Sequence, residues 1–139
     1  MEQYHGTDKK NALDIINGKL SVSKGGGELG QGFYAGDINY EAHNWAWHKY
    51  GKEKAVVNIQ IDDDDFLKLD PLCLDTVQTR YRRLYIKRRK VTRSYLFNRN
   101  VVWAPVVGKI FYNNFQQIKY EGEYSEKALN SSVVIKTIV

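Results

Sequence analysis

The stretch KGGGELGQGFYAGD, residues 24–37, places six glycines around two adjacent aromatic residues, Phe33 and Tyr34. Its segment GQGFYA satisfies the spacing of a dinucleotide-binding glycine motif, which works only where a buried strand enters the turn and a helix leaves it. The residues before it are polar and interrupted by glycine, so we expect no strand to enter this turn. We therefore interpret Gly30 and Gly32 as a tight turn that brings backbone close to a ligand. Phe33 is expected to face the core and Tyr34 the ligand.

Length and composition predict a single domain over residues 1–139. With 139 residues, the chain is long enough for one core but too short for separate cofactor and substrate domains. Its 42% apolar and 13% aromatic residues are typical of a globular protein. No apolar run approaches the roughly 20 residues that cross a bilayer. The first ten residues lack the basic-then-apolar order of a signal peptide, and a single cysteine, Cys73, suits a reducing compartment. We therefore predict a cytoplasmic protein with no membrane segment.

Charge is distributed unevenly along the chain. Residues 1–70 carry 8 Lys and Arg against 12 Asp and Glu, whereas residues 71–139 carry 13 against 4. Nine of the basic residues lie between Arg80 and Arg99, interleaved with aromatics, as in surfaces that bind nucleic acid. The solvated face of an amphipathic helix explains the same pattern equally well. The candidate acceptor-binding residues are Arg80, Arg82, Arg83, Lys87, Arg88 and Arg89.

Two groups of metal-ligand residue types lack the spacing of a metal site. The four consecutive aspartates at residues 62–65 do not alternate with spacers as a calcium loop does. His43 and His48 are five residues apart, which does not place both on one helical face. We predict no metal site, and interpret residues 62–65 as a charged turn or as a partner for the basic stripe.

Apolar periodicity predicts short helices mixed with strands. Helices are expected up to Gly18 after a cap at Thr7 or Asp8, at residues 38–50 after a cap at Asp37, from Asp75 or Thr76 to about Lys90, and near residues 125–129. Strands are expected at residues 54–61, 100–107, 115–120 and 132–139. This order predicts an α+β fold.

Several short motifs resemble the ADP-ribosyltransferase superfamily, in its branch related to the poly(ADP-ribose) polymerases. YHGT at residues 4–7 and GELGQGFYAGDINYEAHNWA at residues 27–46 are similar to that branch's His-Gly-Thr strand and Gly-x-Gly-x-Tyr segment. Later pieces, Asn98-Arg99, VVWAPVVG and the order QI then KAL, resemble a family of small bacterial proteins that carry a GxGFY motif. The resemblance spans nearly the whole chain. It implies a small split antiparallel β-sheet core with short helices.

The resemblance also implies that NAD is consumed as a substrate. His5 would bond the adenosine ribose, the Gly6 backbone would bind the nicotinamide carboxamide, and Tyr34 would stack on the nicotinamide ring. The expected NAD-binding residues are His5, Gly6, Thr7, Gly32, Phe33 and Tyr34. The bond from nicotinamide to ribose would then break as positive charge develops on the sugar.

The third catalytic position departs from the family pattern. The best-known members carry a glutamate at the start of a late strand, and the equivalent residue here is Gln117, which offers neither a charge nor a general base. Glu121 and Glu123 have the Glu-x-Glu spacing that some transferases place in the neighbouring turn. We expect His5, Tyr34 and Gln117 to be catalytic, and retain the two glutamates as alternative carboxylates on the acceptor side.

Two functions follow from the resemblance. The first is an NAD-dependent ADP-ribosyltransferase, such as a toxin or anti-phage effector, with a macromolecular acceptor and an antitoxin protein as a further partner. The basic stripe favours nucleic acid over protein as the acceptor. The alternative is a catalytically inactive module that binds NAD, ADP-ribose or nucleic acid, and the glutamine at position 117 favours it.

Overall fold

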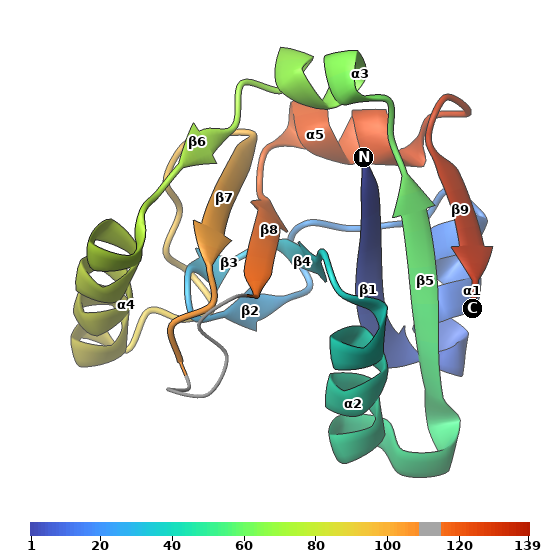
Figure 1. Cartoon of the computed structure of the whole chain (residues 1–139), viewed down its shortest axis with the longest axis horizontal. Coiled ribbons are helices and arrows are strands. Elements are labelled where there is room, and N and C mark those ends of the chain that lie inside the picture. Colours follow the sequence, from blue (N-terminus) through green and yellow to red (C-terminus); the bar gives the residue numbers. More distant parts are fainter. Residues whose placement is uncertain (109–114) are drawn as a thin grey trace.

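A seven-stranded β-sheet forms the centre of the molecule, and short helices surround it (Figure 1). The computed structural model describes residues 1–108 and 115–139. The strands of the sheet are β1 (Glu2–Asp8), β4 (Phe33–Gly36), β5 (Lys54–Gln60), β6 (Leu72–Cys73), β7 (Val101–Pro105), β8 (Gln116–Tyr120) and β9 (Ile135–Ile138). Their order is β6-β7-β8-β4-β1-β5-β9, and every neighbouring pair is antiparallel except β6 and β7. The α+β prediction is confirmed, but the sheet is mixed rather than wholly antiparallel.

Four of the five helices in the described part of the chain lie close to their expected positions. The helices are α1 (Lys9–Ile16), α2 (Asn39–Tyr50), α3 (Asp63–Lys68), α4 (Thr76–Arg89) and α5 (Glu123–Asn130), with a short 3-10 turn, η1 (Gly51–Glu53). Asp8 caps α1 by accepting from the Asn11 amide, and Asp75 forms a capping box with Gln78 at the start of α4. Among the described residues, no helix has both the length and the apolar character needed to cross a membrane.

Two local predictions were wrong. Asp37 does not cap α2, because its carboxylate instead accepts from the backbone amide of Gln116, 79 residues later. Residues 62–65 do not form a turn: Asp62 caps α3 and the other three aspartates begin it. Acidic side chains are favourable in the first turn of a helix, where the backbone N–H groups are unpaired. Their ion pairs are with the Met1 amino group and Lys68, not with the basic stripe.

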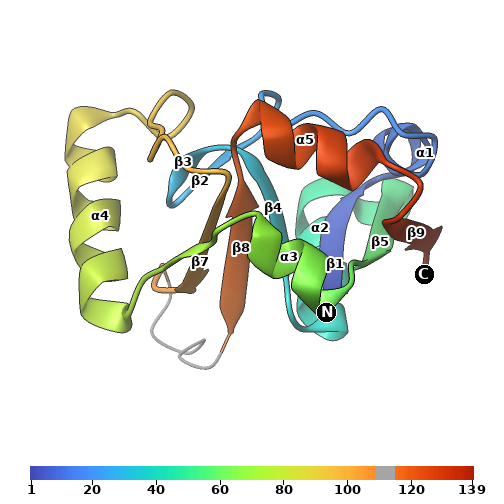
Figure 2. The same ribbon diagram turned by 90° about the horizontal axis from the view of Figure 1, so that it is seen from above.

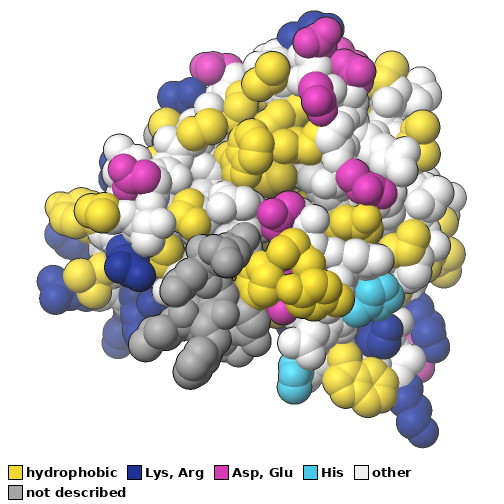
Figure 3. Space-filling model, in the orientation of Figure 1, with side chains coloured by type: hydrophobic (Ala, Val, Ile, Leu, Met, Phe, Trp, Pro, Cys, Tyr) yellow, Lys and Arg dark blue, Asp and Glu magenta, His cyan; other side chains and the backbone are white. Residues whose placement is uncertain are grey.

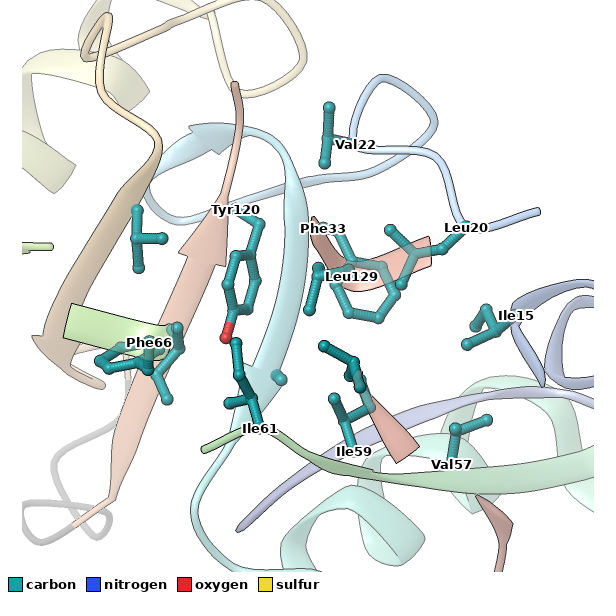
Figure 4. Close-up of a cluster of buried hydrophobic side chains, with 14 of the residues drawn as sticks. Ile15, Leu20, Val22, Phe33, Val57, Ile59, Ile61, Phe66, Tyr120 and Leu129 are labelled. Atoms are coloured by element: carbon teal, nitrogen blue, oxygen red, sulfur yellow. The ribbon is translucent and has the colours of Figure 1, made fainter. Parts of the chain in front are cut away.

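Helices α1 and α2 pack on opposite faces of β1 and β5. Alternate residues of a strand point to opposite faces. Val56 lies in a cluster with Ala42 and Ala46 of α2, whereas Val57 lies with Ile15 of α1 in the main core. Figure 4 shows that core, which also receives side chains from β4, β8, α3 and α5.

The sheet divides between β1 and β4. Strand β1 pairs with β5 over its whole length, and β4 pairs with β8 over its whole length. Strands β1 and β4, in contrast, share a single residue pair, Tyr4 with Gly36. Beyond that pair they separate, so the sheet consists of two halves joined at one point.

The glycine-rich stretch packs tightly against the protein itself. It forms a small hairpin of β2 (Gly26–Gly27) and β3 (Gly30–Gln31), and the Gln31 amide donates to the Tyr95 carbonyl at 3.1 Å. A Cβ atom at Gly30 would overlap the Tyr95 carbonyl, and one at Gly32 would lie 2.8 Å from the Lys119 side chain. These two glycines therefore admit neighbouring parts of the chain, and the prediction that they admit a ligand was wrong for Gly30.

Helix α4 lies at one end of the molecule, and α1 and β9 lie at the other (Figures 1 and 2). Its inward side carries Thr79 and Ile86, which are buried, while most of its other side chains are exposed. The Thr79 hydroxyl donates to the Asp75 carbonyl at 2.6 Å, so this buried hydroxyl needs no hydrogen-bond partner in the element against which α4 packs. The basic residues of α4 therefore lie at one end of the molecule, at the left of Figure 3, while further Lys and Arg side chains are visible at its top and lower right.

Alanine at Gly30 should destabilise the fold more than alanine at Gly51. Both glycines have a positive φ, 91° and 54°, so each replacement costs roughly 1 kcal/mol in backbone strain. At Gly30 the new methyl would also overlap the Tyr95 carbonyl, whereas at Gly51 it meets no described atom within 4 Å. We expect the free energy of unfolding in urea to fall by about 1 kcal/mol for Gly51→Ala and by about 2–4 kcal/mol for Gly30→Ala. Equal losses of unfolding free energy for the two variants would contradict the close approach of Gly30 to the Tyr95 carbonyl.

Candidate active site

A cleft of about 760 Å³ follows the opening between β1 and β4. This volume lies within the range of roughly 300–1,000 Å³ typical of small-molecule sites. Residues of α1 and of α2, which cover opposite faces of β1, both line it, together with residues 24–28 and the start of β8. All six residues expected to bind NAD line the cleft: His5, Gly6, Thr7, Gly32, Phe33 and Tyr34.

His5 connects the two halves of the sheet where backbone pairing stops. Its Nδ1 lies 2.5 Å from the Tyr34 carbonyl oxygen, and its ring lies 4.2 Å from the ring of Phe33, centre to centre. A carbonyl only accepts, so Nδ1 carries the proton and Nε2 is left as an acceptor. Burial lowers the pKa of His5 to about 4, which keeps the ring neutral at physiological pH. Nε2 has no hydrogen-bond partner within the described ranges.

Tyr34 is held in place through its hydroxyl. The hydroxyl donates to the Gly30 carbonyl at 2.6 Å and accepts from the Leu29 amide at 3.2 Å. Burial raises the pKa of Tyr34, so the phenol stays protonated and remains a donor. The ring also lies directly against the Gly27 backbone, where a Cβ atom would be 2.8 Å from it. A fixed aromatic residue thus lines the cleft.

Gln117 enters the cleft from β8 and meets Glu28, a residue that the sequence reasoning missed. The Gln117 Nε2 atom donates to Glu28 Oε1 at 2.5 Å and to the Pro105 carbonyl at 3.1 Å. Glu28 Oε1 also accepts from the Val107 amide at 2.9 Å. The available signal was weak: Glu28 is the single carboxylate within the glycine-rich residues 24–36.

Glu121 and Glu123 lie outside the cleft. Glu121 is buried beside Lys119, whose Nζ lies 2.5 Å from its Oε2, and it accepts from the backbone amides of Phe97 and Arg99. Burial lowers the pKa of Lys119, although the bond to Glu121 opposes that effect. Glu123 begins α5, is exposed, and pairs with Lys127 at 3.5 Å. The structure therefore gives Glu121 the task of holding residues 97–99, and brings neither glutamate to Gln117.

Five of the six acceptor-binding candidates are exposed on α4, and the sixth is not. We call Arg80, Arg82, Lys87, Arg88 and Arg89 the basic helix surface. Arg83 points instead into the cleft, where its Nε lies 3.4 Å from Glu28 Oε2. Its role in binding an acceptor stays a prediction, now for a residue beside Glu28.

Trp45 of α2 also lines the cleft. Its indole is half-exposed and lies 6.0 Å from the ring of Tyr50, with the Lys49 ammonium 4.7 Å from the indole centre. These residues give the cleft an aromatic and cationic rim on the β1 half of the sheet, where α2 packs. Glu28 lines the cleft on the other half, beside Gln117 of β8.

No protein-family model matches this sequence, and no curated protein is similar enough to count as a match. A function for the chain has to follow from the residues that the cleft brings together.

Acidification should destabilise the protein through His5. The folded chain keeps His5 neutral down to about pH 4, whereas an unfolded histidine titrates near 6.5, so the unfolded chain binds more protons between these values. The stabilisation is fully present above about pH 6.5, and roughly 2–3 kcal/mol of it is lost as the pH falls toward 4. Urea unfolding between about pH 4.5 and 7.5 measures this slope.

His5→Asn should remove that part of the slope, because an amide donates to the Tyr34 carbonyl but does not titrate. His48→Asn, which replaces an exposed histidine of α2, is the matched control for loss of an imidazole. Equal pH slopes for the wild type and His5→Asn would contradict the assignment.

Proposed function

We propose that this chain is an NAD-dependent ADP-ribosyltransferase that modifies a macromolecular acceptor. One observation carries the proposal: a neutral histidine, a fixed tyrosine ring and a glutamine amide border one cleft at the opening of the sheet. These three are the residues that the resemblance to the ADP-ribosyltransferase superfamily selects, and they come from three different strands. Their meeting supports the same superfamily's fold for the whole chain.

His5 and Tyr34 suit the binding of NAD. Because Nδ1 donates to the Tyr34 carbonyl, the His5 Nε2 atom can accept a hydrogen bond from a ribose hydroxyl. The Tyr34 ring offers a flat apolar face to the nicotinamide, and its tethered hydroxyl prevents the ring from turning away. Both contacts require no rearrangement of the protein, which favours binding because the side chains are already ordered.

The chemistry is the displacement of nicotinamide from the ribose. As that bond breaks, positive charge develops on the sugar, and polar groups fixed around the sugar stabilise it. The Gln117 amide, held by two hydrogen bonds, is such a group. Its neighbour Glu28 supplies a negative charge in the same cleft.

The basic helix surface supports nucleic acid as the acceptor. Its five cations are exposed, and Tyr81 and Tyr85 on the same helix are exposed as well. Cations that contact phosphates and aromatic rings that stack on bases are the usual means of binding single strands. Arg83 connects this helix to the cleft, so a strand bound along α4 would reach the reacting sugar.

A second function has one observation in its favour. No carboxylate occupies position 117, and the amide there cannot act as a general base. A module that binds NAD or ADP-ribose without turnover would need no such base. Binding by calorimetry with no release of nicotinamide would favour this alternative.

Tyr34→Ala should weaken NAD binding, because it removes the stacking face. Stacking on an aromatic side chain contributes about 1–3 kcal/mol, so we expect an increase in Kd of at least about fivefold. Tyr34→Phe keeps the ring and loses only the two hydroxyl bonds, and should bind more tightly than Tyr34→Ala. The decisive measurement on the wild type is nicotinamide release from labelled NAD in the presence of RNA, DNA and cell protein. No release and no labelled product would refute the transferase.

The basic helix surface should bind a single-stranded oligonucleotide in a salt-dependent way. Arg88→Ala together with Arg89→Ala removes two phosphate contacts, so the slope of log affinity against log salt should fall by about 1–2. Fluorescence polarisation with a labelled mixed-sequence oligonucleotide measures this slope. Lys9→Ala with Lys10→Ala, two adjacent cations at the other end of the molecule, is the control. An equal effect of both pairs would mean that only net charge matters.

A further inference from the structure

Glu28 is the most constrained carboxylate in the cleft. Its side chain is 16% exposed and has three partners: the Gln117 amide nitrogen at 2.5 Å, the Val107 amide at 2.9 Å and the Arg83 guanidinium at 3.4 Å. The partners come from β8, from the segment just after β7 and from α4, so the carboxylate sits where three parts of the chain converge. Neither the NAD-binding set nor the acceptor surface uses it.

The hydrogen bonds of Gln117 determine which way its amide points. A carboxylate and a carbonyl oxygen only accept, so the Nε2 atom must face Glu28 and Pro105, and both of its hydrogens are then used. The amide oxygen has no partner within residues 1–108 and 115–139. Gln117 lines the cleft, and no buried side-chain polar atom lacks a partner among these residues, so this oxygen is accessible from the cleft.

The carboxylate also changes the electrostatics of that oxygen. A hydrogen bond from an amide N–H to an anion polarises the amide and increases the negative charge on its oxygen. The site is largely shielded from water, which strengthens the effect. Arg83 pairs with the other carboxylate oxygen, Oε2, at 3.4 Å.

We propose that Glu28 is a positioning residue of the transfer reaction: through Gln117 it orients a polarised amide oxygen toward the ribose and supplies the negative charge that position 117 lacks. This role rests on the proposed function. In the reaction, the bond from ribose C1′ to the nicotinamide nitrogen breaks, and its electron pair leaves with nicotinamide, which becomes neutral. The positive charge moves to the ribose, where the amide oxygen, backed by the carboxylate, stabilises it. A lone pair of the acceptor then bonds to C1′, and the acceptor proton passes to solvent.

Glu28→Gln tests the charge while nearly preserving the shape. We expect kcat for nicotinamide release to fall at least about tenfold and KM for NAD to change less than about threefold, because the interaction strengthens only as charge develops. Glu53→Gln, the same change at an exposed glutamate outside the cleft, should leave both constants unchanged. Thermal unfolding of each variant shows whether it is folded.

Two variants at position 117 separate a charge role from a packing role. Gln117→Glu alone places two carboxylates at hydrogen-bond distance, so they share a proton and the pH profile of kcat should gain an ionisation that the wild type lacks. Combining Gln117→Glu with Glu28→Gln restores one carboxylate and one amide in exchanged positions. The exchanged pair should recover at least about tenfold in kcat over Glu28→Gln alone.

The outcomes distinguish this inference from the function on which it rests. If the wild type releases no nicotinamide, the transferase is refuted and the role of Glu28 with it. If the wild type is active and Glu28→Gln keeps its kcat, the role of Glu28 is refuted and the transferase stands. Should Glu28→Gln fail to fold, an exchanged pair that is folded but less active than Gln117→Glu would overturn the proposal.

Discussion

The hydrogen bond from His5 to the Tyr34 carbonyl is the constraint on which the site depends. Strands β1 and β4 share one residue pair and then separate, and this bond spans the gap immediately beyond that pair. A backbone carbonyl at an open sheet edge needs a donor, and water or a side chain must provide it. Because the imidazole does so, the sheet can open into a cleft without leaving the carbonyl unpaired.

The glycine-rich stretch is held by side chains from distant elements and by Tyr34 of the stretch itself. Lys119 donates to the Leu29 carbonyl. The Tyr34 hydroxyl accepts from the Leu29 amide and donates to the Gly30 carbonyl. Gln117 and Arg83 hold the Glu28 carboxylate. Lys119 is wholly buried, and its charge is matched by Glu121. A buried ion pair stabilises a fold only when its remaining hydrogen-bonding groups are satisfied, and here backbone groups satisfy them. Flexible sequence thus forms a defined wall of the cleft.

The uneven distribution of charge along the sequence places acidic and basic residues on different helices of the fold. Acidic residues gather on α3 and basic residues on α4, which stands at one end of the sheet (Figure 3). The two groups do not neutralise each other, because the aspartates cap and begin their own helix. Arg83, on the same helix, lines the cleft instead. The proposed acceptor surface therefore lies next to the proposed reaction site, and Arg83 connects the two.

The sequence by itself determined the local structure. Caps at Asp8 and Asp75, apolar periodicity and β-branched runs depend on neighbouring residues, and they located four of the helices and four of the strands. Short motifs also located six of the cleft residues, His5 and Tyr34 among them. The tertiary structure decided the rest, because Glu28 and Gln117 are 89 residues apart and meet only through the pairing of β4 with β8 and the fold of the glycine hairpin. Burial likewise removed Glu121 from the candidates: no local pattern distinguishes a carboxylate that binds a buried lysine from one that faces a ligand.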